Sequence, residues 1–498
     1  MIIIKIAEPN EAPAEQVANR ESEQELFWKL IEDIKNPQST NGRAVLFTGI
    51  MGIGKSSLKN KLIQLIDHHN EKNDDYFIVS ISEKFLENSS ETEIFERVFK
   101  KIVKKCESLK KRLRRDISSL DIMKILRAFS AIFGGKAPSD LRSSEYHNLI
   151  RRILDTLKEI GNEFSKKKQI LVIFIDDLQK SSVIEYPIFD TILNDLPKNI
   201  FLISFFRREF EEEELKKDIE KYNNLNGIFK RFAKVHDLQG LDSEGIIDFV
   251  KLRHDLKISP RQANLLKKMV NGHPLHLTFG INAIVESGKD FNEESIKKYF
   301  KPEIRDQVLD IIINLPKEHK EVLEASSILW EHIEPEAVAQ ILDKKIPRIL
   351  ETLRYFAIKV PQRDRFYPEA KFRFWHDIFR EETRKIIRPK HLDVYHGKAA
   401  EYFESIFNKK KEISIYRKII SCHQTAEHYF LANNSKKALK FCYITGDTYH
   451  SRWELNLAYE FYLKALQSAE NIDDYENQAG AIHQIGRVLQ DQGNLDEA

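Results

Sequence analysis

The segment Gly49-Ile50-Met51-Gly52-Ile53-Gly54-Lys55-Ser56-Ser57 constrains the fold more than any other part of the chain. Its glycines at the first and sixth positions, followed by lysine and serine, have the spacing of a phosphate-binding loop. An apolar run at residues 44–48 precedes the loop, and a helical pattern runs from Ser57 to about His69. This strand–loop–helix order is the context that such a loop requires. The sequence therefore predicts a nucleoside triphosphate site on a parallel α/β sheet.

The residue types of the loop explain its chemistry. Glycines let backbone N–H groups turn inward around a polyphosphate, and the following helix N-terminus favours the anion. Lys55 would reach the β and γ phosphates, and the Ser56 hydroxyl would ligate Mg²⁺. We therefore expect ATP or ADP with Mg²⁺ as cofactors, held by Gly49, Gly52, Gly54, Lys55, Ser56 and Ser57.

A second nucleotide element follows the apolar run Ile170–Ile175, which ends in Asp176-Asp177. A fully apolar strand is typical of a parallel sheet that is covered on both faces. At its tip, Asp176 would hold Mg²⁺ together with Ser56, and Asp177 would orient the attacking water. Alone, the pattern also fits a strand that stops at a solvated acidic turn.

The next strand, Ile200 to Phe206, runs into Arg207-Arg208. An arginine at this strand tip could sense the γ-phosphate, and we assign that role to Arg207. Two adjacent arginines leave the register open, and Arg208 fits equally well as surface charge. We thus expect Asp176, Asp177 and Arg207 to carry hydrolysis.

Length and composition limit the classes of protein and partner only broadly. The chain has 498 residues, too many for a single core, with 42% hydrophobic and 31% charged residues. Its formal net charge of +2 argues neither for nor against nucleic acid. The three scattered cysteines fit neither a disulfide framework nor a zinc site, which indicates a reducing, cytoplasmic setting. No apolar run approaches the ~18 residues of a membrane span, so we expect no membrane partner.

The order of strand and helix patterns predicts a multidomain α/β + α protein. The expected parts are a lead-in with a helix from Ser22 to Lys35, a P-loop NTPase core, a helical lid, a winged-helix domain and an α-solenoid. Their expected ranges are 1–40, 41–240, 241–302, 303–390 and 391–498. The core includes a long helical insertion from about Glu91 to Lys168. The winged-helix interpretation rests on several short helices before a hairpin, a pattern that a helical linker also fits.

Small residues recur twelve positions apart near the C-terminus, at Ala426 and Ala438, Gly446 and Ala458, and Gly486 and Ala498. Small residues allow helices to cross closely, which is how tetratricopeptide repeats stack. Such a solenoid binds a protein or ligand on its surface. Because solenoids need a polar capping helix, we expect further repeats after Ala498.

Taken together, these parts resemble the signal-transducing P-loop ATPases with numerous domains, the group that contains plant disease-resistance proteins, apoptotic ATPases, and bacterial regulators and antiphage sensors. Three motifs carry the resemblance beyond the phosphate loop and the two aspartates. Arg20-Glu21 is similar to a Gly-Arg-Glu lead-in that lies against the adenine, with Asn19 in place of glycine. Gly272-His273-Pro274-Leu275 is similar to an element whose proline packs on the base. Trp375-His376-Asp377 is similar to a Met-His-Asp motif whose histidine contacts the β-phosphate of ADP.

The resemblance implies a switch. Arg20, Pro274 and His376 would contact bound ADP and hold a closed monomer, and exchange for ATP would release the His376 contact. Nucleotides shift such an equilibrium only through their differential contacts with the two states. The opened core would form a homo-oligomer, the repeats would sense a partner or ligand, and slow ATP hydrolysis would reset the switch, in bacterial defence or regulation.

Two other functions stay open. A DNA-binding ATPase of the replication-initiator or clamp-loader sort would use the basic residues within 100–115 on phosphates. Apolar residues spaced through that run favour a solvated amphipathic helix instead, so nucleic acid is the weaker alternative. A nucleotide-regulated transcription activator would need a DNA-binding domain beyond Ala498.

Overall fold

The structure is a computed structural model of the full chain. It describes residues 14–18, 20–36, 38, 42–72, 76–84, 94–95, 97–102, 104–105, 143–180, 187–208, 227–329, 332–353, 357–359, 372–374, 376–409, 415–452 and 454–492. Almost all described residues up to Ile304 form one compact unit, and those from Arg305 form a second.

The first unit contains a five-stranded, all-parallel sheet with the strand order β2-β3-β4-β1-β5. Its strands are β1 (Arg43–Gly49), β2 (Phe77–Lys84), β3 (Gln169–Asp176), β4 (Ile200–Arg207) and β5 (Lys234–Asp237). The strands β1, β3 and β4 lie where the apolar runs predicted them, and the predicted parallel α/β sheet is confirmed. The chain leaves β1 for the far edge at β2, returns through β3 and β4, and then crosses to β5 on the other side of β1. The order therefore reverses beside β1, which is where ligands bind in open parallel sheets.

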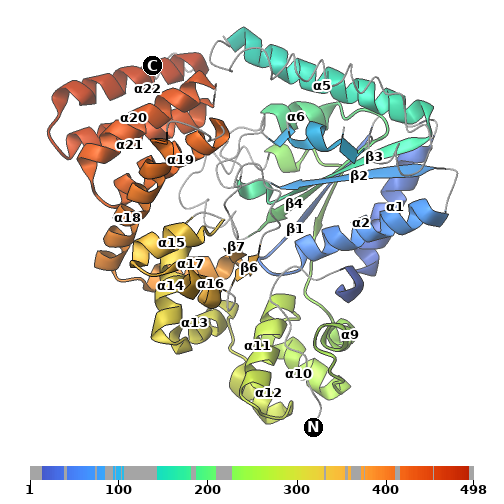
Figure 1. Ribbon diagram of the computed structural model, residues 1–498. Coiled ribbons are helices and arrows are strands. Elements are labelled where there is room, and N and C mark those ends of the chain that lie inside the picture. Colours follow the sequence, from blue (N-terminus) through green and yellow to red (C-terminus); the bar gives the residue numbers. More distant parts are fainter. Residues whose placement is uncertain are drawn as a thin grey trace. The chain divides into compact units, whose positions relative to one another are not determined.

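Helices cover both faces of this sheet (Figure 1). The covering helices are α1 (Glu21–Lys35) and α2 (Lys55–Lys72) on one face, and α5 (Ser143–Lys166) and α6 (Pro187–Asn194) on the other. Successive side chains of a strand point to opposite faces. In β3, Val172 and Phe174 accordingly pack with α1 and α2, whereas Leu171 and Ile173 pack with α5 and α6. This two-sided burial explains why β3 is apolar throughout.

Four helices complete the first unit: α9 (Ser243–His254), α10 (Pro260–Val270), α11 (Pro274–Glu286) and α12 (Glu293–Tyr299). They form a separate small core of their own. Side chains cap each N-terminus, as in α10, where Ser259 and Gln262 form a capping box before Pro260. The helical-lid assignment of this segment stays a prediction.

The second unit begins with short helices and a small hairpin. Its elements are α13 (Ile304–Asn314), α14 (Lys317–Ser327), α15 (Pro335–Leu342), α16 (Ile346–Leu353), the antiparallel strands β6 (Ala357–Lys359) and β7 (Phe372–Phe374), and α17 (Asp377–Ile386). The order of several short helices followed by a hairpin is the predicted one. The winged-helix assignment stays a prediction.

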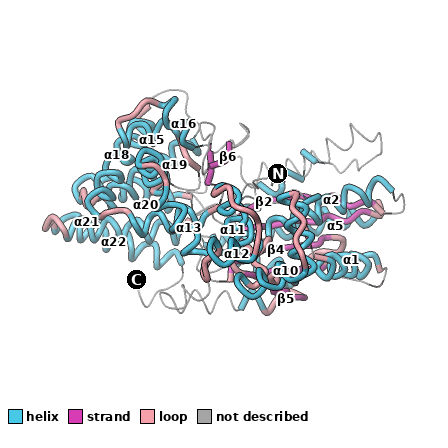
Figure 2. The backbone as a smooth tube through the Cα atoms, turned by 90° about the horizontal axis from the view of Figure 1, so that it is seen from below, coloured by secondary structure: helices cyan, strands magenta, loops and turns pink. Residues whose placement is uncertain are grey.

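Five long helices follow: α18 (Pro389–Phe407), α19 (Ile415–Leu431), α20 (Ser435–Ser451), α21 (Leu455–Glu470) and α22 (Tyr475–Gln492). Consecutive helices lie side by side (Figure 2). Gly446 allows one such approach, because a Cβ atom at this position would lie 2.6 Å from the Tyr462 ring. A buried ion pair, Arg417 to Glu334 at 2.5 Å, ties α19 to α15. The tetratricopeptide assignment also stays a prediction.

Some expectations fall outside the described residues. They include residues 106–142 of the helical insertion, Asn19, Trp375, and the last segment 493–498 with Ala498. The expected boundary at 390/391 falls within the first turn of α18, so the helix continues across it. In the part of the chain that the structure describes, no helix combines the length and apolarity needed to cross a membrane.

Candidate nucleotide-binding site

The phosphate-binding loop joins β1 to α2 at the carboxyl end of the sheet. Gly52 and Gly54 have φ angles of +78° and +102°, a region that residues with side chains rarely adopt. Gly52 also has no room for a side chain, because a Cβ atom would lie 2.7 Å from Leu275 Cβ. The loop conformation thus requires glycine at both positions. Ser57 follows in the first turn of α2.

Lys55 is the first residue of α2, and its side chain turns back over the loop. Its ammonium donates hydrogen bonds to the carbonyl oxygens of Gly49, at 2.6 Å, and Ile50, at 2.8 Å. The charge therefore lies directly on the loop backbone. The predicted contact of Lys55 with the β and γ phosphates stays a prediction.

Asp176, at the end of β3, meets the start of α2. Its Oδ2 accepts hydrogen bonds from Ser56 Oγ at 3.0 Å and from Lys59 Nζ at 2.7 Å. Burial alone would raise the pKa of Asp176, but the Lys59 ammonium and the Ser56 hydroxyl outweigh it and hold that pKa below its ordinary value. Asp176 is therefore ionised at neutral pH.

This arrangement fits the predicted Mg²⁺. Magnesium prefers hard oxygen ligands and in phosphate sites uses one or two protein groups besides water and substrate. Ser56 and Asp176 provide a hydroxyl and a carboxylate within hydrogen-bond distance of each other. No cluster of three or more His, Cys, Asp or Glu able to hold a metal occurs among the described residues. One hydroxyl and one carboxylate are a donor set that suits an ion bound mainly by phosphates and water.

Asp177 follows β3 in a left-handed conformation, with φ of +57°. The chain then turns into a short 3₁₀ helix, η3 (Leu178–Lys180). Within it, Gln179 Nε2 donates to Asp177 Oδ1 at 3.0 Å, and Gln179 Oε1 accepts from the Arg207 N–H at 3.1 Å. The tips of β3 and β4 are therefore joined by one side chain.

The two arginines at the tip of β4 have different surroundings. Arg207 lies opposite Gly49 in the β1–β4 register. Arg208 instead forms an ion pair with Asp237 at 2.7 Å, and the same carboxylate accepts a bond from Thr48. Arg208 therefore has a structural role, because it links β4 to the end of β5 across β1. The role of γ-phosphate sensor stays a prediction for Arg207.

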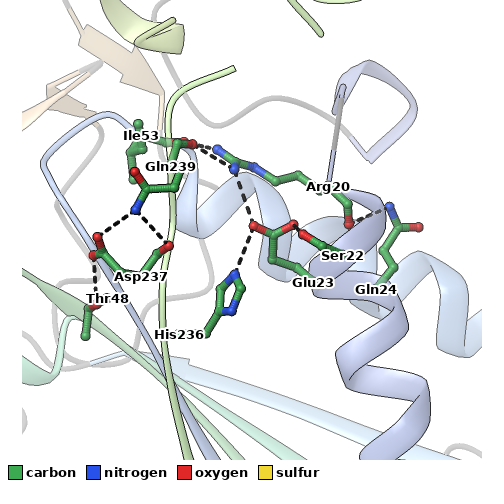
Figure 3. Close-up of polar contacts among 9 residues, drawn as sticks. All are labelled: Arg20, Ser22, Glu23, Gln24, Thr48, Ile53, His236, Asp237 and Gln239. Atoms are coloured by element: carbon green, nitrogen blue, oxygen red, sulfur yellow. Dashed lines mark hydrogen bonds and ion pairs between the residues drawn. The ribbon is translucent and has the colours of Figure 1, made fainter. Parts of the chain in front are cut away.

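Arg20 is buried beside the loop (Figure 3). Its guanidinium donates to the carbonyl oxygens of Ile53, at 2.6 Å, and Gln239, at 2.9 Å. Burial lowers the pKa of Arg20, and the carboxylate of Glu23, 3.5 Å away, opposes that shift. The Arg20 side chain thus ties the start of α1 to the loop and to the segment after β5. The predicted contact with adenine stays a prediction.

The lid reaches the loop through Gly272-His273-Pro274-Leu275. His273 caps α11: its Nδ1 accepts from the His276 N–H, so its Nε2 carries the proton and donates to the Met51 carbonyl at 2.6 Å. Gly272 has a φ of +68° and touches the backbone of Leu241. Pro274 is the first residue of α11. It stands between His273, which donates to Met51, and Leu275, which lies close to Gly52. Its predicted packing on the base remains untested.

His376 belongs to the second unit. It is the N-cap of α17, and its Nδ1 accepts a hydrogen bond from the Ile378 N–H at 3.3 Å. Its predicted contact with nucleotide bound in the first unit stays a prediction.

Comparison with known proteins agrees with this geometry. Residues 25–222 match the family model described as the KAP family P-loop domain. This part of the chain is a P-loop NTPase domain. No curated protein matches the chain.

Several solved structures resemble this chain at low sequence identity. A signal transduction ATPase with numerous domains and a tetratricopeptide repeat sensor, from Pyrococcus horikoshii, is 15% identical and has a TM-score of 0.44 over 98% of this chain and 76% of its own. The ORC1 protein of Aeropyrum pernix in complex with DNA is 13% identical, with a TM-score of 0.32 over 74% of this chain and 93% of its own. A Walker-type ATPase of Pyrococcus abyssi is 13% identical, with a TM-score of 0.34 over 75% of this chain and 98% of its own.

Sequence reasoning missed three residues that hold the site together: Lys59 and Gln179 in the P-loop NTPase domain, and His273 after it. Lys59 had a usable signal, because it lies one helical turn after Lys55 and therefore on the same face of α2. Gln179 and His273 had none, because their partners include backbone groups, which leave no trace in residue identity.

Proposed function

We propose that this protein is an ATP/ADP-dependent signalling switch with slow ATPase activity. The observation that carries the proposal is the meeting of Lys55, Ser56 and Asp176 at the point where the strand order reverses. A lysine, a hydroxyl and an ionised carboxylate in one place are what a magnesium-bound polyphosphate needs.

The proposed chemistry uses the strand tips. Mg²⁺ supplies charge neutralisation at the phosphates when it is bound, held by Ser56 and Asp176. Asp177 orients the attacking water, and Arg207 at the next strand tip senses the γ-phosphate. Positioning and electrostatics supply most of the catalysis in phosphoryl transfer. Slow turnover suits a switch, because the nucleotide state then lasts long enough to be read.

The proposed switch itself involves the lid and the second unit. Arg20 and the Pro274 motif join the loop to α1 and to the lid, so a change in the loop reaches both. We assign His376 a contact with ADP that ATP removes, the helices α18–α22 a protein or ligand partner, and the ATP-bound form a homo-oligomer. Each contact must differ between the two nucleotide states to shift the equilibrium.

One experiment tests the proposal. Purified protein is assayed for bound nucleotide, for ATP hydrolysis, and for mass by light scattering with ADP or ATP. Lys55→Ala should lose nucleotide, Asp177→Ala should bind ATP without hydrolysing it, and Lys61→Ala on α2 should behave as wild type. If Lys55→Ala and wild type retain the same nucleotide, the site assignment is wrong. If ATP leaves the mass unchanged, even with candidate partners, the oligomerisation is wrong.

A further inference from the structure

The buried amide of Gln179 lies between Asp177 and Arg207, two of the residues to which hydrolysis is assigned. It is 5% exposed, on η3, directly after Asp177 and Leu178. Its Nε2 donates to the Asp177 carboxylate and its Oε1 accepts from the backbone N–H of Arg207. Because the Arg207 N–H can only donate, the amide orientation is fixed, and the NH₂ group must face Asp177.

The backbone explains how Gln179 reaches this position. The β3–β4 ladder ends at the pair Ile175 and Ser204, so the strand tips beyond it lack ladder hydrogen bonds to each other. The left-handed turn at Asp177 reverses the chain, and η3 then carries Gln179 back over the gap. The planar amide of Gln179 thus provides hydrogen bonds between the two strand tips, where the β3–β4 ladder provides none.

We infer that Gln179 is a positioning residue for ATP hydrolysis, which holds the Asp177 carboxylate in register with the tip of β4 that carries Arg207. This inference rests on the proposed function. Only a carboxamide serves both partners, because it offers a donor and an acceptor on one rigid plane. Glutamate would keep the bond to the Arg207 N–H but place a second carboxylate against Asp177. Methionine has nearly the same shape and offers neither bond.

Loss of Gln179 should disturb the orientation of Asp177 and not the binding of nucleotide. Gln179 is bonded to neither Lys55 nor Ser56, so its loss should leave nucleotide affinity within about threefold. Misplacing the group that orients the attacking water should slow the chemical step by about 10- to 100-fold. The effect therefore belongs in kcat and not in KM.

The test measures single-turnover ATP hydrolysis, ATP affinity and thermal unfolding of the full chain. Gln179→Met and Gln179→Glu should both hydrolyse about 10- to 100-fold more slowly at near wild-type affinity. Gln262→Met is the matched control, since the Gln262 amide likewise bridges a backbone N–H, of Ser259, and a carbonyl, of Phe291, but in the lid. It should hydrolyse at the wild-type rate.

A double-mutant cycle with Asp177→Asn distinguishes positioning from general loosening. If Gln179 acts through Asp177, adding Gln179→Met to Asp177→Asn should change the residual rate less than twofold. Equal fold losses in both backgrounds would overturn the inference, as would wild-type rates in both Gln179 variants, while the proposed function would stand. No hydrolysis by the wild type above that of Lys55→Ala would overturn both.

Discussion

Lys59 Nζ lies 2.7 Å from Asp176 Oδ2, and the two side chains are only 10% and 4% exposed. The ammonium therefore neutralises a buried carboxylate that the proposed function assigns to Mg²⁺. Removing one member of a buried ion pair leaves an uncompensated charge and costs about 3–5 kcal/mol.

Lys59→Met should accordingly lower the melting temperature strongly, because Asp176 stays buried without its cationic partner. Mg²⁺ with ATP would supply a replacement cation, so its addition should raise the melting temperature more in Lys59→Met than in wild type. Thermal unfolding with and without Mg²⁺ and ATP measures both effects. The double variant Lys59→Met/Asp176→Asn should recover most of the stability. If Mg²⁺ and ATP raised the melting temperature equally in Lys59→Met and in wild type, the Lys59 ammonium and Mg²⁺ would not both neutralise Asp176.

Arg20→Met should weaken ATP binding by at least about tenfold, because each of the two charge-assisted hydrogen bonds that it removes is worth about 1.5–3 kcal/mol and about 1.4 kcal/mol corresponds to tenfold. It removes the bonds to the carbonyls of Ile53 and Gln239, so the loop loses its tie to α1. Titration calorimetry measures the affinity. Arg261→Met is the control, because Arg261 forms only an exposed pair with Glu293, and pairs of that kind contribute little. Wild-type affinity in Arg20→Met would show that the loop keeps its shape unaided.

The sequence was sufficient for the parts of the site that are contiguous. The loop, the apolar strand before Asp176 and the tip of β4 have local patterns, and all three lie where the pattern placed them. Arg20 shows where this reasoning stops. A family motif predicted that it contacts the nucleotide, which stays a prediction, but gave no sign that its guanidinium would also meet two backbone carbonyls. Carbonyls occur at every residue, so no pattern of residue types reveals which of them a distant side chain will meet.

His376→Ala should release ADP faster and favour assembly if the imidazole contacts the nucleotide. His376 is also the N-cap of α17, so alanine would disturb that helix as well. His376→Asn separates the two roles, because asparagine is among the best N-cap residues and lacks the ring. Both variants should lose ADP in retention assays and shift to higher mass on size exclusion. ADP retention like that of wild type in His376→Asn would show that only the cap matters.

Acid should destabilise the second unit through a buried histidine pair. His396 Nδ1 lies 2.7 Å from His428 Nδ1. Burial, with a smaller contribution from Arg384, lowers the pKa of His396 to about 4, from 6.5, and burial also lowers that of His428. Unfolding restores the ordinary pKa values. The contribution of the neutral histidine pair to the free energy of unfolding is therefore fully present above about pH 6.5 and is lost as the pH falls toward 4.

For His396 alone this linkage amounts to about 2 kcal/mol at pH 5. Thermal unfolding at pH 7.5 and pH 5 measures it. His396→Gln should lose less stability between these pH values than wild type, because glutamine can donate to His428 and does not titrate. His68→Gln, at an exposed position of α2, should match the wild type. A wild-type melting temperature that is equal at both pH values would rule out the effect.

Gly446 and Gly397 lie in the interiors of α20 and α18, and alanine should affect them in opposite directions. Alanine is better than glycine in a helix by about 1 kcal/mol. At Gly397 the nearest atom to the new Cβ is Ala432 Cβ at 4.0 Å, so Gly397→Ala should raise the melting temperature. At Gly446 the new Cβ would lie 2.6 Å from the ring of Tyr462, whose hydroxyl donates to Asp447.

The Tyr462 ring cannot move away without breaking that hydrogen bond, and overpacking costs about 1–3 kcal/mol. Gly446→Ala should therefore lower the melting temperature in spite of the gain in helix propensity. Gly446→Ala/Tyr462→Leu removes the ring and should recover part of the loss. If Gly446→Ala stabilised the protein as Gly397→Ala does, α20 and α21 would have to lie further apart than the structure shows, and close helix crossing at the small residues would be excluded.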